Sequence, residues 1–436
     1  MTYLIIAVVL CIYISMILSS KYKTAIAFIG SGLLLIIGAI SSAFDVKAAF
    51  TMFPSEIIIL LIVLTLFTDN FERLGLINLI GYKFLKMTKE NRALIILLIP
   101  ILIYATSLFM NNLTVVLLFT YMALYLAIEY KLPIVPLLVS LVIASNIGGA
   151  PLPWADTPAV ILTIYTDFTL VDFLNKLFLP CLIYIGLLSA YTYLWYRKSI
   201  PQKRIMPFKD KPKVDWEGSK FPIILFLLYI VALSIGPFYD ISIAYISLIF
   251  GGILLFFDRK KPIDALNDLH IMDSIAFLVG LFIIGGVLQY SGILAGISNF
   301  IMGIAQNNPY LIVISILLLA FVISTFLSAG PAAATLIPIC ASLTYLVPFK
   351  LIYAALAFGI LAGSSMLPWS ATGGPILLGQ VNEFIKKPHR CTEEEKKRIR
   401  KIYSLKEYAK FSIPFSLIIL ICSLIYLVIV LKVVSA

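Results

Sequence analysis

The chain carries Leu-Pro-Trp-Ala-Asp-Thr-Pro-Ala-Val-Ile-Leu at residues 152–162 and Leu-Pro-Trp-Ser-Ala-Thr-Gly-Gly-Pro-Ile-Leu at residues 367–377. Six of the eleven positions are identical, and each copy holds one of the four tryptophans of the chain. Each copy also follows a polar interruption by about forty residues, first Asn111-Asn112 and then Ser328-Ala329-Gly330-Pro331. The two halves of the chain therefore look like duplicates.

The composition around these copies excludes a soluble protein. Of the 436 residues, 61% are hydrophobic and 13% are charged, with a mean hydropathy of +1.04, whereas soluble domains carry roughly 25% charged residues. Lipid accepts such a surface because hydrocarbon penalises charged side chains, not apolar ones. We expect an all-α polytopic membrane protein, whose length holds roughly ten to fourteen crossings and no separate soluble domain.

Apolar runs divide the chain into equal halves. The first half, 1–196, contains seven runs, at 2–20, 24–43, 55–82, 93–110, 113–130, 133–163 and 172–196. A polar connector spans 197–220. The second half, 221–436, contains seven more, at 221–238, 241–257, 270–290, 310–328, 331–347, 351–382 and 411–434.

The charges predict how these runs cross the membrane. The net charge is +11, and 28 of the 33 basic residues fall into six short segments, at 21–23, 83–92, 131, 197–220, 258–268 and 383–410. We interpret these segments as cytoplasmic loops, so the positive charge does not require nucleic acid as a partner. An odd number of runs per half predicts repeats of inverted topology, with both termini outside the plasma membrane.

The five cysteines show no CxxC spacing, and four of them lie within apolar runs. We therefore expect packing residues rather than disulfides or a zinc site. Residues 1–20 lack a basic leading region, which favours a retained first helix over a cleaved signal.

The duplicated segments are also where helices should break. Residues 144–158 hold two glycines and three prolines at mid-membrane depth, and 362–375 have the same character. Such backbone is tolerated only inside protein or beside a water-filled cavity, and paired broken helices indicate a transporter binding site. Half-helix ends there offer N–H groups to anions and carbonyl groups to cations. The alternative is a pair of proline-kinked packing helices.

Asp156 is the most informative carboxylate, because an ionisable group at a mid-membrane break is a functional candidate by default. It is expected to bind a cation or carry a proton, and its counterpart in the second half is Ala371. The rival hypothesis is that Asp156 caps the half-helix that follows it. Asn111 and Asn112 either cap a re-entrant turn or hydrogen-bond across helices.

These residues resemble a known family. Ser145-Asn146-Ile147-Gly148-Gly149, followed by Pro153 and Asp156-Thr157-Pro158, resembles the Ser-Asn-Ile-Gly-Gly…Pro-Ile-Gly-Asp-Pro-Pro motif of the ion transporter superfamily. That group contains arsenite permeases, NhaD-type sodium/proton antiporters, citrate and dicarboxylate symporters and the melanosomal P protein. Phe109-Met110-Asn111-Asn112 resembles the hairpin-tip motif of arsenite permeases. The sequence departs from the pattern at Trp154-Ala155 and at Ser328-Ala329-Gly330-Pro331.

The resemblance implies a scaffold and a transport domain, with five spans and one re-entrant hairpin in each half. The hairpins would be 93–130 and 310–347, and the broken helices 133–163 and 351–382. Residue arguments and resemblance together predict an ion- and substrate-binding set of Asn111, Asn112, Thr114, Ser145, Asn146, Gly148, Gly149, Asp156, Thr157, Ser328, Gly330, Gly363, Ser364, Ser365, Ser370 and Thr372. Within it, Asn112, Ser145, Asn146 and Asp156 are the residues that would hold a sodium ion.

The sequence thus predicts a secondary active transporter of the arsenite permease or sodium/proton antiporter type, working by alternating access and driven by a sodium or proton gradient. A citrate or dicarboxylate transporter is the alternative. No Walker motif occurs, so the energy would come from an ion gradient. A passive channel is a weaker rival, and so is an intramembrane enzyme, for which no His-Glu-x-x-His occurs and only two histidines exist. No cofactor is expected. The partners are a small inorganic or organic ion and the lipid bilayer, and a homodimer is one possible assembly.

Overall fold

Every regular element of the described residues in the computed structural model is a helix, which confirms the all-α expectation. The described residues are 2–18, 22–50, 55–88, 91–110, 134–197, 213–239, 241–267, 269, 272–306, 308–326, 329–368 and 405–435, with isolated positions within 112–127 and 370–397.

The helices of the first half are α1 (Thr2–Leu18), α2 (Lys23–Ser41), α3 (Val46–Phe50), α4 (Ser55–Arg73), α5 (Leu76–Met87), α6 (Arg92–Ser107), α8 (Ile134–Gly149), α9 (Thr157–Tyr165), α10 (Leu170–Phe173) and α11 (Leu179–Tyr196). A short π-helix, Leu174–Phe178, joins α10 to α11. Those of the second half are α12 (Trp216–Ile235), α13 (Ile243–Phe257), α14 (Pro262–Asn267), α15 (Met272–Tyr290), α16 (Ile293–Ala305), α17 (Pro309–Phe326), α18 (Ala329–Leu343), α19 (Leu351–Ser364) and α22 (Leu405–Ser435).

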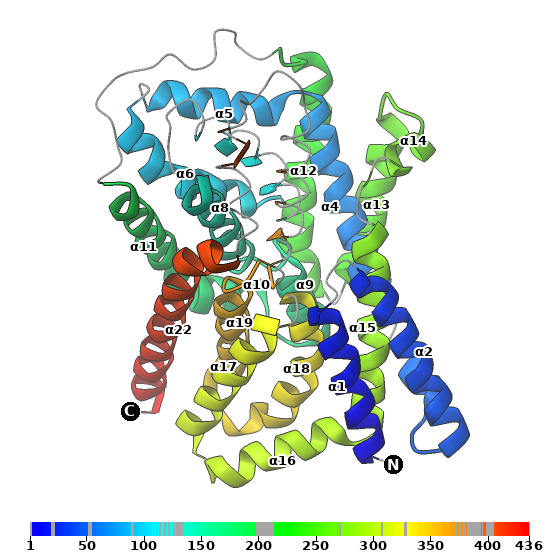
Figure 1. Cartoon of the computed structure of the whole chain (residues 1–436). Coiled ribbons are helices and arrows are strands. Elements are labelled where there is room, and N and C mark those ends of the chain that lie inside the picture. Colours follow the sequence, from blue (N-terminus) through cyan, green and yellow to red (C-terminus); the bar gives the residue numbers. More distant parts are fainter. Residues whose placement is uncertain are drawn as a thin grey trace.

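The same bend occurs in both halves, 217 positions apart. Gly75 separates α4 from α5, Gly292 separates α15 from α16, and both have a φ of 76°. Glycine is the residue that adopts this left-handed backbone without steric cost. The helices that follow lie across opposite ends of the molecule, α5 at the top of Figure 1 and α16 at the bottom.

These crosswise helices correct two sequence expectations. The run 55–82 is not one helix, because it turns at Gly75. The interval between the runs 270–290 and 310–328 is not a mere connection, because it contains α16. Along α16 the buried residues recur at about one helical turn: Ile293, Leu294, Ser298, Ile301 and Ala305. These residues lie on one face, so α16 packs against the molecule on one side and leaves its other side, with Phe300 and Ile304, exposed.

Helices occupy the segments that we expected to form hairpins and broken helices. Helix α6 covers the first arm of the hairpin 93–130, whereas most of its second arm lies outside the described residues. Helices α17 and α18 occupy 310–347. The segment 133–163 divides into α8 and α9, and α19 ends at Ser364 within 351–382.

Each broken helix is held by a serine of the preceding hairpin helix. The Ser107 hydroxyl of α6 donates to the Ser145 carbonyl of α8, and the Ser324 hydroxyl of α17 donates to the Ile360 carbonyl of α19, both at 2.8 Å. The broken helix α19 approaches the hairpin helix α17 closely because it carries a glycine at the contact. A Cβ on Gly363 would lie 2.3 Å from the Phe321 carbonyl oxygen.

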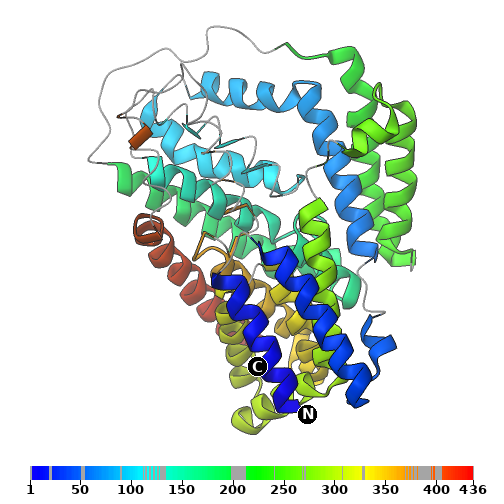
Figure 2. The ribbon, with the colours of Figure 1, turned by 45° about the vertical axis from the view of Figure 1, so that its right-hand side comes forward.

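The two halves interlock. Helix α4 of the first half packs against α12 and α13 of the second, while α15 packs against α2; Figure 2 shows α4 (blue) beside the green helices α12 and α13. The Lys350 ammonium, which precedes α19, forms ion pairs with Asp167 at 2.9 Å and Asp172 at 3.4 Å, which flank the start of α10. The boundaries proposed at 197 and 220 therefore do not separate two independent bodies.

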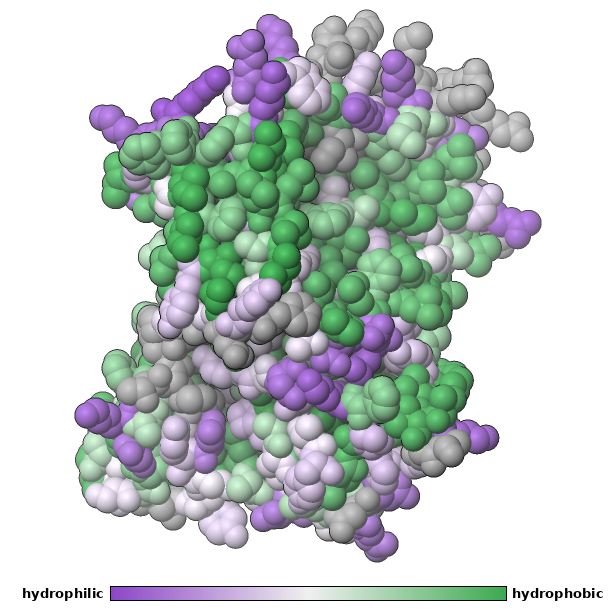
Figure 3. Space-filling view, turned by 180° about the vertical axis from the view of Figure 1, so that it is seen from behind, coloured by the Kyte–Doolittle hydropathy of each residue, from purple (hydrophilic) through white to green (hydrophobic). Residues whose placement is uncertain are grey.

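The exterior suits a membrane. Among the described residues, five helices are long and apolar enough to cross a bilayer, or six if the bent pair α15–α16 counts as one span, and seven further apolar helices are shorter. Figure 3 shows broad hydrophobic areas, with many hydrophilic side chains gathered at the upper and lower ends. The two termini lie at one end, opposite α5 (Figure 1), which agrees with placing both on the same side of the membrane.

Charged residues join α4 to the end of α13. The Arg73 guanidinium forms two bonds to the Asp258 carboxylate, at 2.6 and 3.2 Å, and a third to Asp69 at 2.8 Å. Burial raises the pKa of Asp258, but the hydrogen bonds from Arg73, the Lys260 amide and Asn70, together with the charge of Arg73, outweigh burial and hold the pKa below its usual value. The neighbouring Arg259 pairs at 2.5 Å with Asp215, which caps α12 through the Gly218 amide.

We predict that Arg73→Gln lowers the melting temperature of the purified protein at neutral pH. A carboxyl group with a lowered pKa in the folded state adds stability above its unfolded pKa of about 3.9 and loses that contribution as the pH falls. The melting curves of wild type and variant should therefore converge below that pH. Lys47→Gln, at an exposed lysine, is the control, and an equal difference at all pH values would refute the ion-pair explanation.

We predict that Gly363→Ala destabilises the protein, because the added Cβ meets backbone that cannot move aside. Overpacking typically costs about 1–3 kcal/mol, more than the gain of about 1 kcal/mol in helix propensity. The matched control is Gly186→Ala on α11, where a Cβ meets nothing within 4 Å. Thermal unfolding in detergent should show a lower midpoint for Gly363→Ala only; equal midpoints would contradict the packing argument.

Candidate functional site

The first helix break lies inside protein. All sixteen residues of α8 are buried, and the turn 150–156 that follows contains Pro151 and Pro153 before α9 begins at Thr157. Proline removes a backbone donor and prevents the helix from continuing. The break is thus shielded from lipid, as interrupted backbone in a membrane must be.

Asp156 lies at the end of this turn with 7% of its surface exposed. Its Oδ2 accepts a hydrogen bond of 2.8 Å from the Asn112 Nδ2, while its Oδ1 is buried without a partner among the described residues. Asp156 stands at the N-cap position of α9, but its side chain makes no capping hydrogen bond to that helix. None of the ion pairs formed by described residues includes Asp156.

A short chain of hydrogen bonds positions Asp156. The Oδ1 of Asn112 accepts from the Ser107 hydroxyl, which also lies 2.8 Å from the Ser145 carbonyl oxygen. A Cβ on Gly149 would lie 2.7 Å from the Asp156 Cβ and 2.8 Å from the Asn112 Nδ2. Only glycine at 149 therefore lets the asparagine and the aspartate meet. Gly148, one residue earlier, instead lets α6 approach, since a Cβ there would lie 2.7 Å from the Tyr104 carbonyl oxygen.

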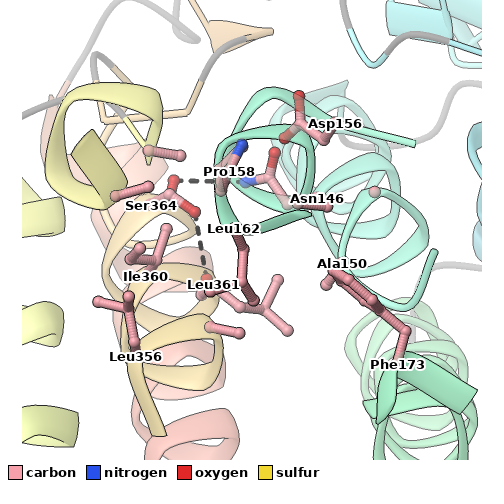
Figure 4. Close-up of a pocket in the computed structure, with 15 residues that line it drawn as sticks. Asn146, Ala150, Asp156, Pro158, Leu162, Phe173, Leu356, Ile360, Leu361 and Ser364 are labelled. Atoms are coloured by element: carbon pink, nitrogen blue, oxygen red, sulfur yellow. Dashed lines mark hydrogen bonds between the residues drawn. The ribbon is translucent and has the colours of Figure 1, made fainter. Parts of the chain in front are cut away.

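Asn146 connects the two breaks. Its Nδ2 lies 3.4 Å from the Ser364 carbonyl oxygen and 3.5 Å from the Ser365 hydroxyl, at the end of α19. Figure 4 shows Asn146 facing Ser364 across the gap between the two halves. These long contacts join residues 218 and 219 positions apart.

The second break is closed by serines. The Ser370 hydroxyl lies 2.8–3.2 Å from the carbonyl oxygens of Gly363, Ser364 and Leu367. The Ser416 and Ser412 hydroxyls of α22 donate to the carbonyl oxygens of Ala362 and Met366, at 2.5 and 2.7 Å. These bonds satisfy carbonyls that the end of the helix leaves free.

A small cavity lies between the breaks. It has about 30 Å³ of room, the volume of one water molecule. The described residues that line it include no lysine, arginine or histidine. Its walls are Asn146, Gly149, Ala150, Asp156, Pro158, Ala159, Leu162, Phe173, Ala329, Ala333, Leu356, Ala357, Ile360, Leu361 and Ser364.

Four half-helix ends therefore meet at this cavity. The first turns of α9 and α18 contribute Pro158 and Ala329, and the last turns of α8 and α19 contribute Gly149 and Ser364. N-terminal turns favour an anion and C-terminal turns favour a cation. Together with the carboxylate of Asp156, the arrangement offers groups that attract a cation and groups that attract a small anion.

The structure brings together only part of the predicted set. Asn112, Ser145, Asn146 and Asp156 lie near one another, but Asn112 bonds Asp156 whereas Asn146 faces α19. The Ser145 hydroxyl bonds the Val142 carbonyl of its own helix, as those of Ser364 and Ser365 bond Leu361. Thr157 and Gly330 lie in the first turns of α9 and α18. Four predicted residues fall outside the described residues: Asn111, Thr114, Ser328 and Thr372.

Sequence reasoning missed the serines that hold the breaks. Ser412 and Ser416 are one helical turn apart in an otherwise apolar run, a spacing that places both hydroxyls on one face. Ser107 and Ser324 lie 217 positions apart, so the repeat could have identified them. What the sequence does not reveal is which carbonyl each serine reaches.

Several known proteins are similar to this chain over most of its length. Magnetosome protein MamN of Magnetospirillum gryphiswaldense is 23% identical over 412 residues, covering 91% of this chain and 92% of that protein. A 46 kDa membrane protein of Mycobacterium leprae is 23% identical over 82% of this chain and 85% of its own. An uncharacterized transporter of Mycobacterium tuberculosis is 22% identical, covering 74% of this chain and 78% of that protein.

The fold has a solved counterpart in the YdaH transporter of Alcanivorax borkumensis, which has a TM-score of 0.57 and 12% identity, over 91% of this chain and 88% of that one. A family model described as citrate transporter matches residues 12–363 and 241–436. The protein is a membrane transporter and not an enzyme. Because the family match extends over most of its length, the chain belongs to the citrate transporter family.

Proposed function

We propose that the protein is a secondary active transporter that moves a small ion by alternating access, with Asp156 coupling the movement to a sodium or proton gradient. The observation that carries this proposal is the Asp156 carboxylate, buried at the cavity with Oδ1 unpartnered and no basic side chain in the described lining. An intramembrane carboxylate without a fixed counter-charge is suited to bind and release a cation or a proton.

The size of the cavity favours an inorganic ion as substrate. Room of about 30 Å³ accommodates a dehydrated ion or one water, whereas ligand pockets for organic molecules usually measure about 300–1,000 Å³. We therefore place the arsenite permease or sodium/proton antiporter type first. Citrate or a dicarboxylate is the second candidate, because the family model carries that description and because two helix N-terminal turns face the cavity and attract anions.

We propose further that the two halves of the chain are repeats of inverted topology. The bends at Gly75 and Gly292 and the serine bonds at Ser107 and Ser324 are each 217 positions apart, and α5 and α16 lie at opposite ends (Figure 1). Two such repeats provide two related arrangements of one site, which alternating access requires. We place the connector 197–220 in the cytoplasm and both termini outside.

Purified protein in sealed proteoliposomes tests the function. Arsenite, sodium and citrate are offered separately under an imposed sodium or proton gradient. Saturable uptake that follows a gradient supports a carrier, and the substrate that accumulates decides between the two candidates. Ohmic current without saturation would instead identify a channel and refute the proposal.

We predict that Asp156→Asn abolishes gradient-driven uptake while the protein still folds. The amide can accept the same hydrogen bond from Asn112 but cannot carry a charge or bind a proton at neutral pH. The control Asp264→Asn removes an exposed carboxylate on α14 and should transport as wild type does. Unchanged flux and pH dependence in Asp156→Asn, with a normal melting temperature, would remove this residue from the mechanism.

Cysteine labelling tests on which side of the membrane the connector and the N-terminus lie. A cysteine replacing Lys203 in the connector should react with an impermeant maleimide only from the cytoplasmic side. A cysteine replacing Tyr3, which is 88% exposed, should react only from outside. Labelling of both positions from one side would contradict the inverted arrangement.

A further inference from the structure

Two large apolar cavities lie outside the site described above. The first, of about 320 Å³, is enclosed by α1, α15, α16, α17 and α18. The second, of about 360 Å³, is enclosed by α4, α5, α6 and α12, together with the residues that follow α6. Each is more than ten times the volume of the cavity between the helix breaks.

The two cavities occupy equivalent places in the two halves. Eight of the ten residues that line the second lie 217 positions from a residue that lines the first. On the crosswise helices α5 and α16, Leu76 pairs with Ile293. Phe109, which follows α6, pairs with Phe326 at the end of α17. Two chance packing defects would not share this register, so the cavities are a feature of the repeat.

The helices that close each cavity from the side show the same register. Ile223, Phe226 and Leu227 of α12 occupy the places that Ile6, Val9 and Leu10 hold on α1.

The bends at Gly75 and Gly292 explain why these places are empty. At each bend the chain turns from a long helix into the crosswise helix α5 or α16. The corner between that helix and the following hairpin helix is left without side chains to fill it. Because α5 and α16 lie at opposite ends (Figure 1), there is one such corner at each end of the molecule.

The cavities open toward lipid. Side chains at their edges are exposed on the apolar exterior: Leu10 is 54% exposed, Phe326 49%, Leu227 61% and Phe109 45%. The described walls carry few polar side chains, namely Tyr13 and Thr335 in the first cavity and Thr106 in the second. Water does not fill apolar cavities of this kind, and the solvent at their openings is the hydrocarbon of the bilayer.

We propose that each cavity binds an acyl chain of a membrane lipid, one chain from each leaflet. The chain would lie between the first hairpin helix, α6 or α17, and the neighbouring helix, α12 or α1. Its attraction is the dispersion contact that it makes with cavity walls that no protein side chain fills, not a headgroup contact. The inference requires only that the chain is a membrane protein and is independent of which ion it carries.

Photolabelling tests the proposal. The protein is reconstituted in vesicles containing phosphatidylglycerol with a diazirine on one acyl chain, irradiated, digested and mapped by mass spectrometry. We expect adducts on wall residues that bulk lipid cannot reach, Leu336 of the first cavity, 1% exposed, and Met110 of the second, 7% exposed. Ile425 of α22, 52% exposed, reports contact with bulk lipid.

Filling each cavity provides the matched controls. Ile297→Trp should remove the adduct at Leu336 but keep that at Met110, and Leu79→Trp should do the reverse, since Ile297 and Leu79 line the first and second cavities respectively. The adduct that remains in the other cavity shows that each variant is folded.

Adducts confined to Ile425 and other exposed positions would overturn the proposal. So would adducts at Leu336 and Met110 that persist unchanged in both tryptophan variants, because they would then arise without occupation of the cavities. Neither result depends on transport, so failure of this inference is distinguishable from failure of the proposed function.

Discussion

The structure depends on one constraint, that backbone polar groups freed inside a membrane must be bonded within the protein. Helices α8 and α19 end at that depth, and serines supply the bonds. Ser107 and Ser324 reach the carbonyls of Ser145 and Ile360 from the hairpin helices. At the second break, α22 adds further serines and Ser370 caps the last turn. Without these donors the half-helix ends that face the cavity would carry several kcal/mol of unsatisfied polar groups.

The two halves have similar helices, but the side chains at corresponding positions of the site differ. Asn112 and Asp156 of the first half correspond by position to Ala329 and Ala371 of the second. Both alanines are buried, so the equivalent place is filled by methyl groups and holds no charge. The duplicated backbone therefore presents one carboxylate to a cavity that both halves enclose. Asp156 is the one ionisable residue in the described lining of this cavity, which is why our proposal gives it the coupling role.

Glycine decides where the helices can meet. Gly148 and Gly363 occupy equivalent positions and allow the backbone of the hairpin helix to approach, whereas Gly149 makes room for the contact between Asn112 and Asp156. Gly75 and Gly292 perform a different task, because their left-handed backbone turns the chain into the crosswise helices. Glycine thus allows tight helix packing at one place, whereas at the two bends it produces corners that side chains do not fill. The apolar cavities are the consequence of the second task.

The amino-acid sequence alone determined the class and indicated where the helices break, because hydrophobic composition and proline and glycine content are local properties. From the Leu-Pro-Trp repeat it also predicted a duplication. It did not determine the crosswise helices, since α5 and α16 are as apolar as their neighbours and differ only in the period of their buried face. Nor could it show that Asn146 faces Ser364 while Asn112 bonds Asp156. Those pairings join residues 44 and 218 positions apart, and only the packing of the two halves selects one partner among many polar side chains.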